Sequence, residues 1–171
     1  MRSFVPVLAA AFGLLAACSK PAAPAGETTG SVSAESSTAA AAPAALTDAQ
    51  KKTLLSELPA AYQGADLDNG QAKFAICKTC HNVAKGAGDM TGPNLYGVFG
   101  RKAGTSPGFN YSDGMKTLGI TWDADSLNKW VANPHAMVAS TKMTYIGLQD
   151  AKDRTDVVAY LKTVTSPPPS T

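Results

Sequence analysis

The stretch FAICKTCHNV, from Phe74 to Val83, decides how the rest of this chain is interpreted. It places Cys77 and Cys80 three residues apart, with His81 directly after the second cysteine. Residues at this spacing share one face of a helix, so a helix that ends near the cysteines presents both thiols to the same neighbour. The first question is therefore what these two thiols bind.

Three uses of the cysteine pair find little support in the rest of the sequence. A thioredoxin-like redox pair is expected within a βαβ pattern, and the sequence shows none. A structural zinc site needs about four ligands, and the cysteines and histidines after residue 18 are too sparse for a zinc finger: Cys77, Cys80, His81 and His135. A simple disulfide leaves the histidine without a role.

The fourth use is covalent attachment of haem, for which C-x-x-C-H is the signature. Two thiols on one helical face reach two vinyl groups at one edge of a porphyrin, and the adjacent imidazole is held close enough to bind the iron. We therefore predict one haem c per chain, attached through Cys77 and Cys80 and ligated by His81.

The flanking sequence predicts short helices separated by long loops. Thr47 and Gln50 form a capping-box pattern before a helix that Pro59 stops. Further helices are predicted from residue 67 to the cysteines, over 123–133 and over 150–165. Glycine, proline, asparagine and serine between residues 83 and 120 predict loops with at most one helical turn. Because no segment alternates convincingly, the predicted fold class is all-α.

The first residues predict export. MRSFVPVLAAAFGLLAAC carries one positive charge, a short apolar run and small residues before Cys18. The run is shorter than the ~20 residues that span a bilayer. LAAC, residues 15–18, resembles the lipobox of bacterial lipoproteins, whose cysteine is lipidated and becomes the new N-terminus. The alternative is an ordinary signal peptide in which Cys18 has no role.

These patterns divide the chain into four segments: a lipoprotein signal peptide at 1–17, a lipidated cysteine and flexible linker at 18–46, a folded domain at 47–166 and a tail at 167–171. The linker consists mainly of Ala, Pro, Ser and Thr and cannot form a core. From residue 47 onward, thirteen Lys and Arg face eleven Asp and Glu, so the domain is nearly neutral. That balance argues against nucleic acid as a partner.

From about Gly64 to Val164 the chain resembles class I cytochromes c. TGPNLYGVFGRKAGTSPGFNYSDGMKTLGITW, residues 91–122, and TKM, residues 141–143, are similar to the mitochondrial and alphaproteobacterial branch. The resemblance implies an all-α fold whose helices and long loops wrap around one covalently bound haem. It also implies one-electron transfer rather than catalysis, with no catalytic residue and no small-molecule substrate.

The resemblance implies further site residues. Met143 matches the axial methionine, which with His81 completes the metal ligands, and His135 is the alternative sixth ligand. The Pro93 carbonyl is the implied acceptor for the His81 imidazole. Trp130 matches an aromatic residue beside the methionine. Four residues match positions that face the haem propionates: Arg101, Tyr111, Trp122 and Thr141.

The chain also departs from the pattern of the mitochondrial relatives. Met115 stands where they have an asparagine in a polar network near the haem. Lysines that could surround the exposed edge are Lys73, Lys78, Lys85, Lys102 and Lys142. However, other residues occupy five positions that are commonly lysine: Ile76, His135, Ala136, Gln149 and Asp150. We therefore expect weaker electrostatic steering toward an acidic partner.

Together these features predict a membrane-tethered electron carrier, held by lipid on Cys18 at the periplasmic side of a bacterial membrane. The expected partners are a quinol-oxidising cytochrome bc complex as donor and a terminal oxidase as acceptor. One alternative is a carrier dedicated to a single periplasmic dehydrogenase or reductase. Another, from a different class, is a haem enzyme or gas sensor with an open sixth position.

Overall fold

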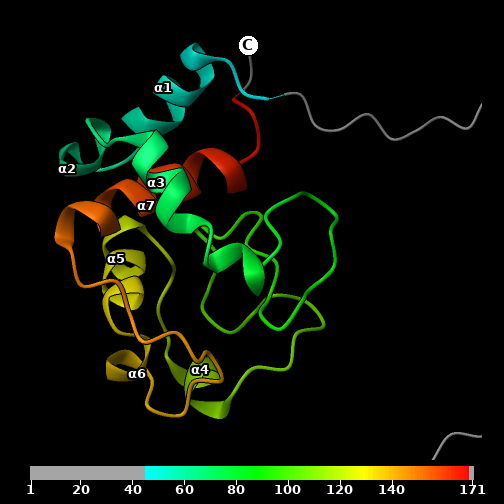
Figure 1. Ribbon diagram of the computed structural model, residues 1–171. Helices are drawn as coiled ribbons and strands as arrows, with labels where there is room; N and C mark the ends of the chain where they lie inside the picture. Colours follow the sequence, from blue (N-terminus) through cyan, green and yellow to red (C-terminus); the bar gives the residue numbers. More distant parts are fainter. Residues whose placement is uncertain (1–44, 170–171) are drawn as a thin grey trace, which may run out of the picture. The chain divides into compact units, whose positions relative to one another are not determined.

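The computed structural model describes residues 45–169. The signal peptide, Cys18 and the linker up to residue 44 lie outside the described residues, as do residues 170–171. The described part is helical, with one isolated β-bridge and no strand, which confirms the all-α prediction (Figure 1). Its elements are α1 (Asp48–Ser56), α2 (Ala60–Gln63), α3 (Leu67–Phe74), the 3₁₀ helix η1 (Cys77–Thr79), α4 (Asp113–Thr117), α5 (Ala124–Ala132), α6 (Pro134–Met137) and α7 (Ala151–Thr165).

The crossing of α3 and α7 forms the centre of the fold (Figure 1). Gly70 allows the two helices to approach closely, because a Cβ atom on this residue would meet the Asp156 carbonyl oxygen and lie 2.8 Å from the Tyr160 Cβ. The buried Phe74 ring lies 5.6 Å from the Tyr160 ring, inclined at 55°. Gly70 and Phe74 of α3 thus pack directly against Tyr160 of α7.

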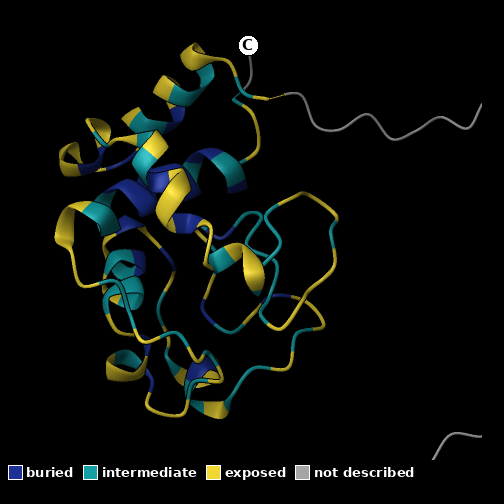
Figure 2. Ribbon diagram, in the orientation of Figure 1, coloured by how far each residue is buried: buried dark blue, intermediate teal, exposed yellow. Residues whose placement is uncertain are grey.

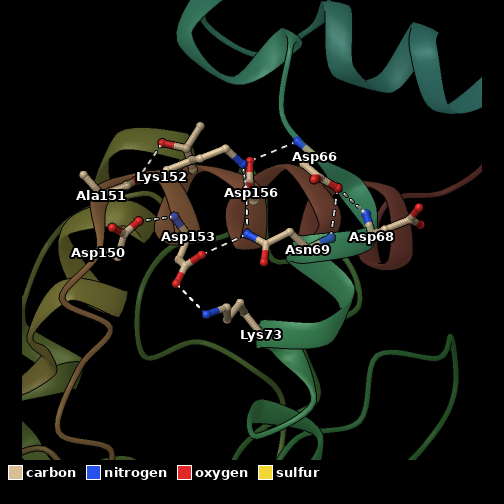
Figure 3. A network of polar contacts seen from close by, with 10 residues as sticks. Asp66, Asp68, Asn69, Lys73, Asp150, Ala151, Lys152, Asp153 and Asp156 are labelled. Atoms are coloured by element: carbon tan, nitrogen blue, oxygen red, sulfur yellow. Dashed lines mark hydrogen bonds and ion pairs between the residues drawn. The ribbon is translucent and has the colours of Figure 1, made fainter.

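A polar network fixes the start of α3 on α7 (Figure 3). The side chain of Asp156 is at its centre, although this residue is only 1% exposed. One carboxylate oxygen accepts a hydrogen bond from the Asp66 backbone N–H at 2.9 Å, and the other accepts from the Asn69 amide at 2.7 Å and from the Lys152 ammonium. The buried carboxylate is thus fully partnered, as a buried charge must be.

Helices α1 and α2 pack on α7. The predicted capping box at the start of α1 is present, since Thr47 and Gln50 each accept a hydrogen bond from the other's backbone N–H. Leu54 is the buried residue of α1. On α2, the Tyr62 hydroxyl lies 3.0 Å from the Asp125 carboxylate and 3.2 Å from the Ala124 carbonyl. These contacts tie α1 and α2 to α5 and α7.

Most remaining predictions agree with the structure. Between residues 83 and 120 the chain forms loops with one short helix, α4. Helix α5 begins at the predicted Asp123 cap, whose carboxylate accepts from the Ser126 N–H at 2.7 Å. The sequence does not predict α2 and α6, because these four-residue helices, at Pro59 and Pro134, are too short to show a periodic pattern.

Buried residues gather where α3, α5 and α7 meet, whereas the loops are mostly half-buried or exposed (Figure 2). The helices thus supply a firm core on one side of the loops, and the loops surround the site described next. Within residues 45–169, no helix has the length and apolar character needed to cross a membrane.

Candidate cofactor site

The loops and the helical core enclose a largely apolar cavity of about 390 Å³. This volume falls in the range of roughly 300–1,000 Å³ that is usual for ligand and cofactor sites. All ten cofactor-binding residues predicted from the sequence line it: Cys77, Cys80, His81, Pro93, Arg101, Tyr111, Trp122, Trp130, Thr141 and Met143. A second hollow, about 460 Å³, is formed by α1–α3 and contains none of them.

The cysteine motif forms a tight turn at the edge of this cavity. The α-helix predicted to reach the cysteines ends at Phe74, and η1 continues the chain through Cys77. The Cys77 carbonyl accepts hydrogen bonds from the backbone N–H of both Cys80, at 3.1 Å, and His81, at 3.0 Å. This shared acceptor places two thiols and an imidazole within one turn, which all line the cavity.

The two thiols do not form a disulfide, and the environment of Cys77 does not suit thiolate chemistry. Burial raises the pKa of the Cys77 thiol to about 11. Reactive redox cysteines have lowered pKa values, because the thiolate is the nucleophile. Within residues 45–169 no three His, Cys, Asp or Glu side chains converge on a metal-sized site.

The His81 imidazole is held in a defined orientation. Its Nδ1 lies 2.7 Å from the Pro93 carbonyl oxygen, which is the acceptor that the resemblance implies. Because a carbonyl only accepts, Nδ1 carries the proton and Nε2 keeps its lone pair for a metal. Burial lowers the pKa of His81, which favours the neutral imidazole that metals bind.

Gly92 also positions this imidazole, and sequence reasoning did not identify it. A Cβ atom at Gly92 would collide with the His81 ring, approaching Nδ1 to 2.7 Å and Nε2 to 2.8 Å. Only a residue without a side chain lets the loop close over the ring. The signal available in the sequence was the Gly-Pro pair before Asn94, which indicates a turn but not what the turn contacts.

Asn94 holds the rest of this loop together. Its side-chain amide donates to the carbonyls of Ala84, at 2.9 Å, and Ala87, at 2.6 Å. Arg101 in turn donates to the Asn94 carbonyl at 3.0 Å and to the Tyr96 carbonyl at 3.2 Å. The guanidinium therefore braces the loop while it lines the cavity, a role that the propionate-facing prediction does not include.

The two tryptophans pack edge to face on the cavity wall, with ring centroids 5.6 Å apart. Trp122 is 8% exposed, and no hydrogen bond joins its indole N–H to another residue in the described part of the chain. An indole N–H only donates, and no buried side-chain donor within residues 45–169 lacks a partner, so this N–H is accessible to solvent. The Trp122 indole is thus a free donor on the wall, as an anionic group of a bound cofactor would require.

The loop between α6 and α7 brings Met143 to the cavity. The Thr141 hydroxyl oxygen accepts from the Met143 backbone N–H at 3.2 Å, which forms a turn around Lys142. His135, the alternative sixth ligand, lies on α6, is exposed and does not line the cavity. Two residues beyond Met143, burial and, to a lesser extent, the charge of Cys77 raise the pKa of Tyr145, which also lines the cavity.

The donor set fits haem c. It combines two thiols for covalent attachment, an oriented imidazole, a thioether, apolar walls and an unpaired indole donor. Thiols, imidazole and thioether are the groups through which proteins hold haem in c-type cytochromes. The fold and the site together thus fit an all-α protein that would hold haem c through two thiols, an imidazole and a thioether.

Comparisons with known proteins agree with this site. The family model Cytochrom_C, described as cytochrome c, matches residues 67–165. Cytochrome c2 of Rhodomicrobium vannielii is 48% identical over 103 residues, which cover 60% of this chain and 82% of that protein. Cytochrome c of Euglena viridis is 48% identical over 100 residues, which cover 58% of this chain and 97% of that protein. The solved structure of cytochrome cH from Methylobacterium extorquens is 43% identical in sequence and has a TM-score of 0.54. The match covers 58% of this chain and 99% of that one.

The chain belongs to the cytochrome c family. It is an electron carrier and not an enzyme. Family membership implies covalently bound haem c, and the cysteines of the C-x-x-C-H motif are present. Helices α1 and α2 precede the matched residues, yet they pack on α7 within the same core.

Proposed function

We propose that this protein carries single electrons from a quinol-oxidising cytochrome bc complex to a terminal oxidase, tethered to the periplasmic side of a bacterial membrane. One haem c per chain would be attached through Cys77 and Cys80, and His81 and Met143 would bind its iron. When bound, this group supplies a one-electron ferric/ferrous couple. The observation that carries the proposal is the convergence of an oriented imidazole and a thioether on one enclosed cavity.

Residues of the chain hold both ligands in place while the charge of the site changes by one electron. The Pro93 carbonyl fixes the imidazole ring, and the Thr141 hydroxyl fixes the turn that carries Met143. A thioether ligand favours the reduced iron and raises the reduction potential toward that of a carrier. With His81 and Met143 both bound to the iron, no position would remain for a substrate, and the site would transfer electrons without making or breaking bonds.

Propionate groups are anionic and need donors when they are partly buried. The Trp122 indole and the Thr141 hydroxyl are donors on the cavity wall, and the Arg101 guanidinium adds positive charge there. Its contacts with two loop carbonyls also keep that charge in position. These residues would bind the propionates and keep water away from them.

The membrane tether is a proposal from the sequence. A lipidated Cys18 would be joined to the domain by a linker with a coil length of about 30 Å. Tethering to the same membrane as the partners raises their effective concentration to as much as millimolar. It therefore reduces the need for long-range electrostatic attraction. Fractionation tests this part: the full-length protein should sediment with membranes, and a soluble mature form that lacks Cys18 would contradict it.

The respiratory role is tested in native membranes. The haem is reduced with quinol, oxygen is admitted, and its redox state is followed with and without inhibitors of the bc complex and of the oxidase. The proposal requires that the first inhibitor blocks reduction and that the second blocks reoxidation, at rates matching respiratory turnover. Slow or inhibitor-insensitive changes would assign the protein to a dedicated periplasmic dehydrogenase or reductase instead.

A further inference from the structure

The loop that carries Met143 joins α6 to α7 and passes beside α5 (Figure 1). Within residues 45–169, no hydrogen bond involves the backbone of residues 144–147, which directly follow this methionine. Nothing in that short segment itself prevents the thioether from moving away from the cavity. The attachment of the chain just beyond it, at residues 148–149, therefore decides how firmly Met143 is held at the cavity wall.

The C-terminal end of α5 provides one part of this attachment. Helix ends leave backbone carbonyls without helical partners. Here the Val131 carbonyl accepts a hydrogen bond from the Leu148 N–H at 2.9 Å, and the Ala132 carbonyl accepts from the Gln149 side-chain amide at 3.4 Å. Gly147 makes this approach possible, because its φ is +108° and a Cβ atom on it would collide with the Ala132 carbonyl oxygen. The loop thus closes on α5 directly after its unbonded segment.

The side chain of Arg154 fixes this closure from α7. Its Nη1 donates to the Leu148 carbonyl at 2.9 Å and to the Gln149 carbonyl at 2.7 Å. Its Nε donates to the side-chain oxygen of Asn128, on α5, at 3.1 Å. Arg154 lies in the first turn of α7, where a positive charge opposes the helix dipole, so helix stability does not explain a cation there. Instead, one guanidinium joins the loop, α5 and α7.

We propose that Arg154 is a positioning residue that holds the loop closed on α5 and thereby keeps the Met143 thioether on the haem iron. This inference rests on the axial ligands named in the proposed function. Arg154 does not line the cavity, so it acts only through the loop. Each time the loop opens, the sixth position becomes available to an external ligand. The apparent affinity for such a ligand is proportional to the fraction of molecules that are open.

The test is a titration of the purified ferric full-length holoprotein with imidazole at neutral pH, followed by its absorption spectrum. Arg154→Met keeps an unbranched side chain but removes the donors, and Asn128→Ala removes the partner on α5. Met143→Ala is the positive control for an open sixth position. Leu54→Ala is the control for a general loss of stability, because Leu54 is buried on α1 and does not line the cavity.

Arg154→Met should bind imidazole about ten- to hundredfold more tightly than wild type, the factor expected for loss of one hydrogen bond to a charged group. Asn128→Ala should bind it about two- to fivefold more tightly, since the two bonds to the loop carbonyls remain. In the double variant Asn128→Ala should add nothing, because the guanidinium through which it acts is absent.

Unfolding by guanidinium separates positioning from general stability. Leu54→Ala should lose about 2–5 kcal/mol of unfolding free energy, the usual cost of truncating a buried leucine, yet bind imidazole as wild type does. Circular dichroism without denaturant verifies that each variant is folded. Asn128→Ala tests the same contact if Arg154→Met does not fold.

Wild-type imidazole affinity in both Arg154→Met and Asn128→Ala would overturn the proposal. Additive effects in the double variant would also overturn it, as would equal tightening by Leu54→Ala, because the opening would then follow global stability. Failure of the proposed ligand set gives a different result. If Met143→Ala bound imidazole no more tightly than wild type, Met143 would not occupy the sixth position, and the ligand set of the proposed function would be refuted.

Discussion

Replacing Gly70 with alanine tests the close approach of α3 and α7. Alanine favours a helix over glycine by about 0.5–1 kcal/mol, so helix propensity alone predicts a more stable protein. The structure predicts the opposite, because the new Cβ would collide with the Asp156 carbonyl, which is backbone of α7 and has no rotamer to change. Overpacking of this kind costs about 1–3 kcal/mol. The net expectation is a loss of roughly 1–2 kcal/mol, or a melting temperature lower by about 4–8 °C.

The assay is guanidinium unfolding of the ferric holoprotein followed by circular dichroism, with Gly64→Ala as the matched control. Gly64 has a φ of −98°, and a Cβ atom there would meet nothing within 4 Å. Alanine at this position should be neutral or stabilising by up to about 1 kcal/mol, through the unfolded state. If Gly70→Ala proved as stable as wild type, the crossing would not be as tight as the structure shows, and the reasoning would be refuted.

Three further changes test the positioning of the site and the core. Gly92→Ala should displace the His81 imidazole, and so alter the absorption spectrum and lower the reduction potential or the haem content. The control Gly88→Ala should change none of these, because a Cβ atom at Gly88 would meet nothing within 4 Å. A normal spectrum for Gly92→Ala would contradict the contact between Gly92 and His81. Burial tends to raise the pKa of Asp156, but its hydrogen bonds outweigh this effect and hold the pKa below its usual value. Its contribution to stability is therefore present above about pH 4 and lost as the pH falls through its folded pKa. Between pH 5 and 3, wild type should lose more stability than Asp156→Asn in urea unfolding, and equal losses would assign the acid sensitivity elsewhere. Tyr62→Phe should cost about 1 kcal/mol by removing the hydroxyl that joins α2 to α5, and an unchanged unfolding free energy would show that bond to be dispensable.

The sequence predicts most of the fold because its helix ends carry local signals. Thr47 and Asp123 are caps whose side chains bond in the predicted way, and residues 150–165 correspond to α7. The α-helix predicted to reach the cysteines stops at Phe74, because the chain tightens into the 3₁₀ turn that lets Cys77 accept from both Cys80 and His81. Such a change of helix type depends on hydrogen bonds that periodicity does not encode.

The site is predictable where a motif or a family resemblance marks it. Residues that act through long-range packing are not. Gly92 contacts the His81 ring only after the intervening loop has folded back, and nothing near Gly92 in the sequence announces that contact. Asp156 directly precedes the buried Val157 on α7. Its own burial, however, requires partners at the start of α3, such as Asp66, which lies ninety residues earlier in the chain. The ion pair of Lys73 with Asp153 and the hydrogen bond of Lys142 to the Asn110 carbonyl likewise depend on residues distant in sequence.

The central claim is that His81 and Met143 occupy both axial positions, which makes the protein a carrier rather than a ligand-binding haem protein. The most direct test is the absorption spectrum of the reduced full-length protein before and after addition of carbon monoxide. The account predicts no change for wild type and a clear shift for Met143→Ala, which serves as the positive control for an opened site. A carbon monoxide shift in wild type at neutral pH would contradict the account and show that the sixth position is open.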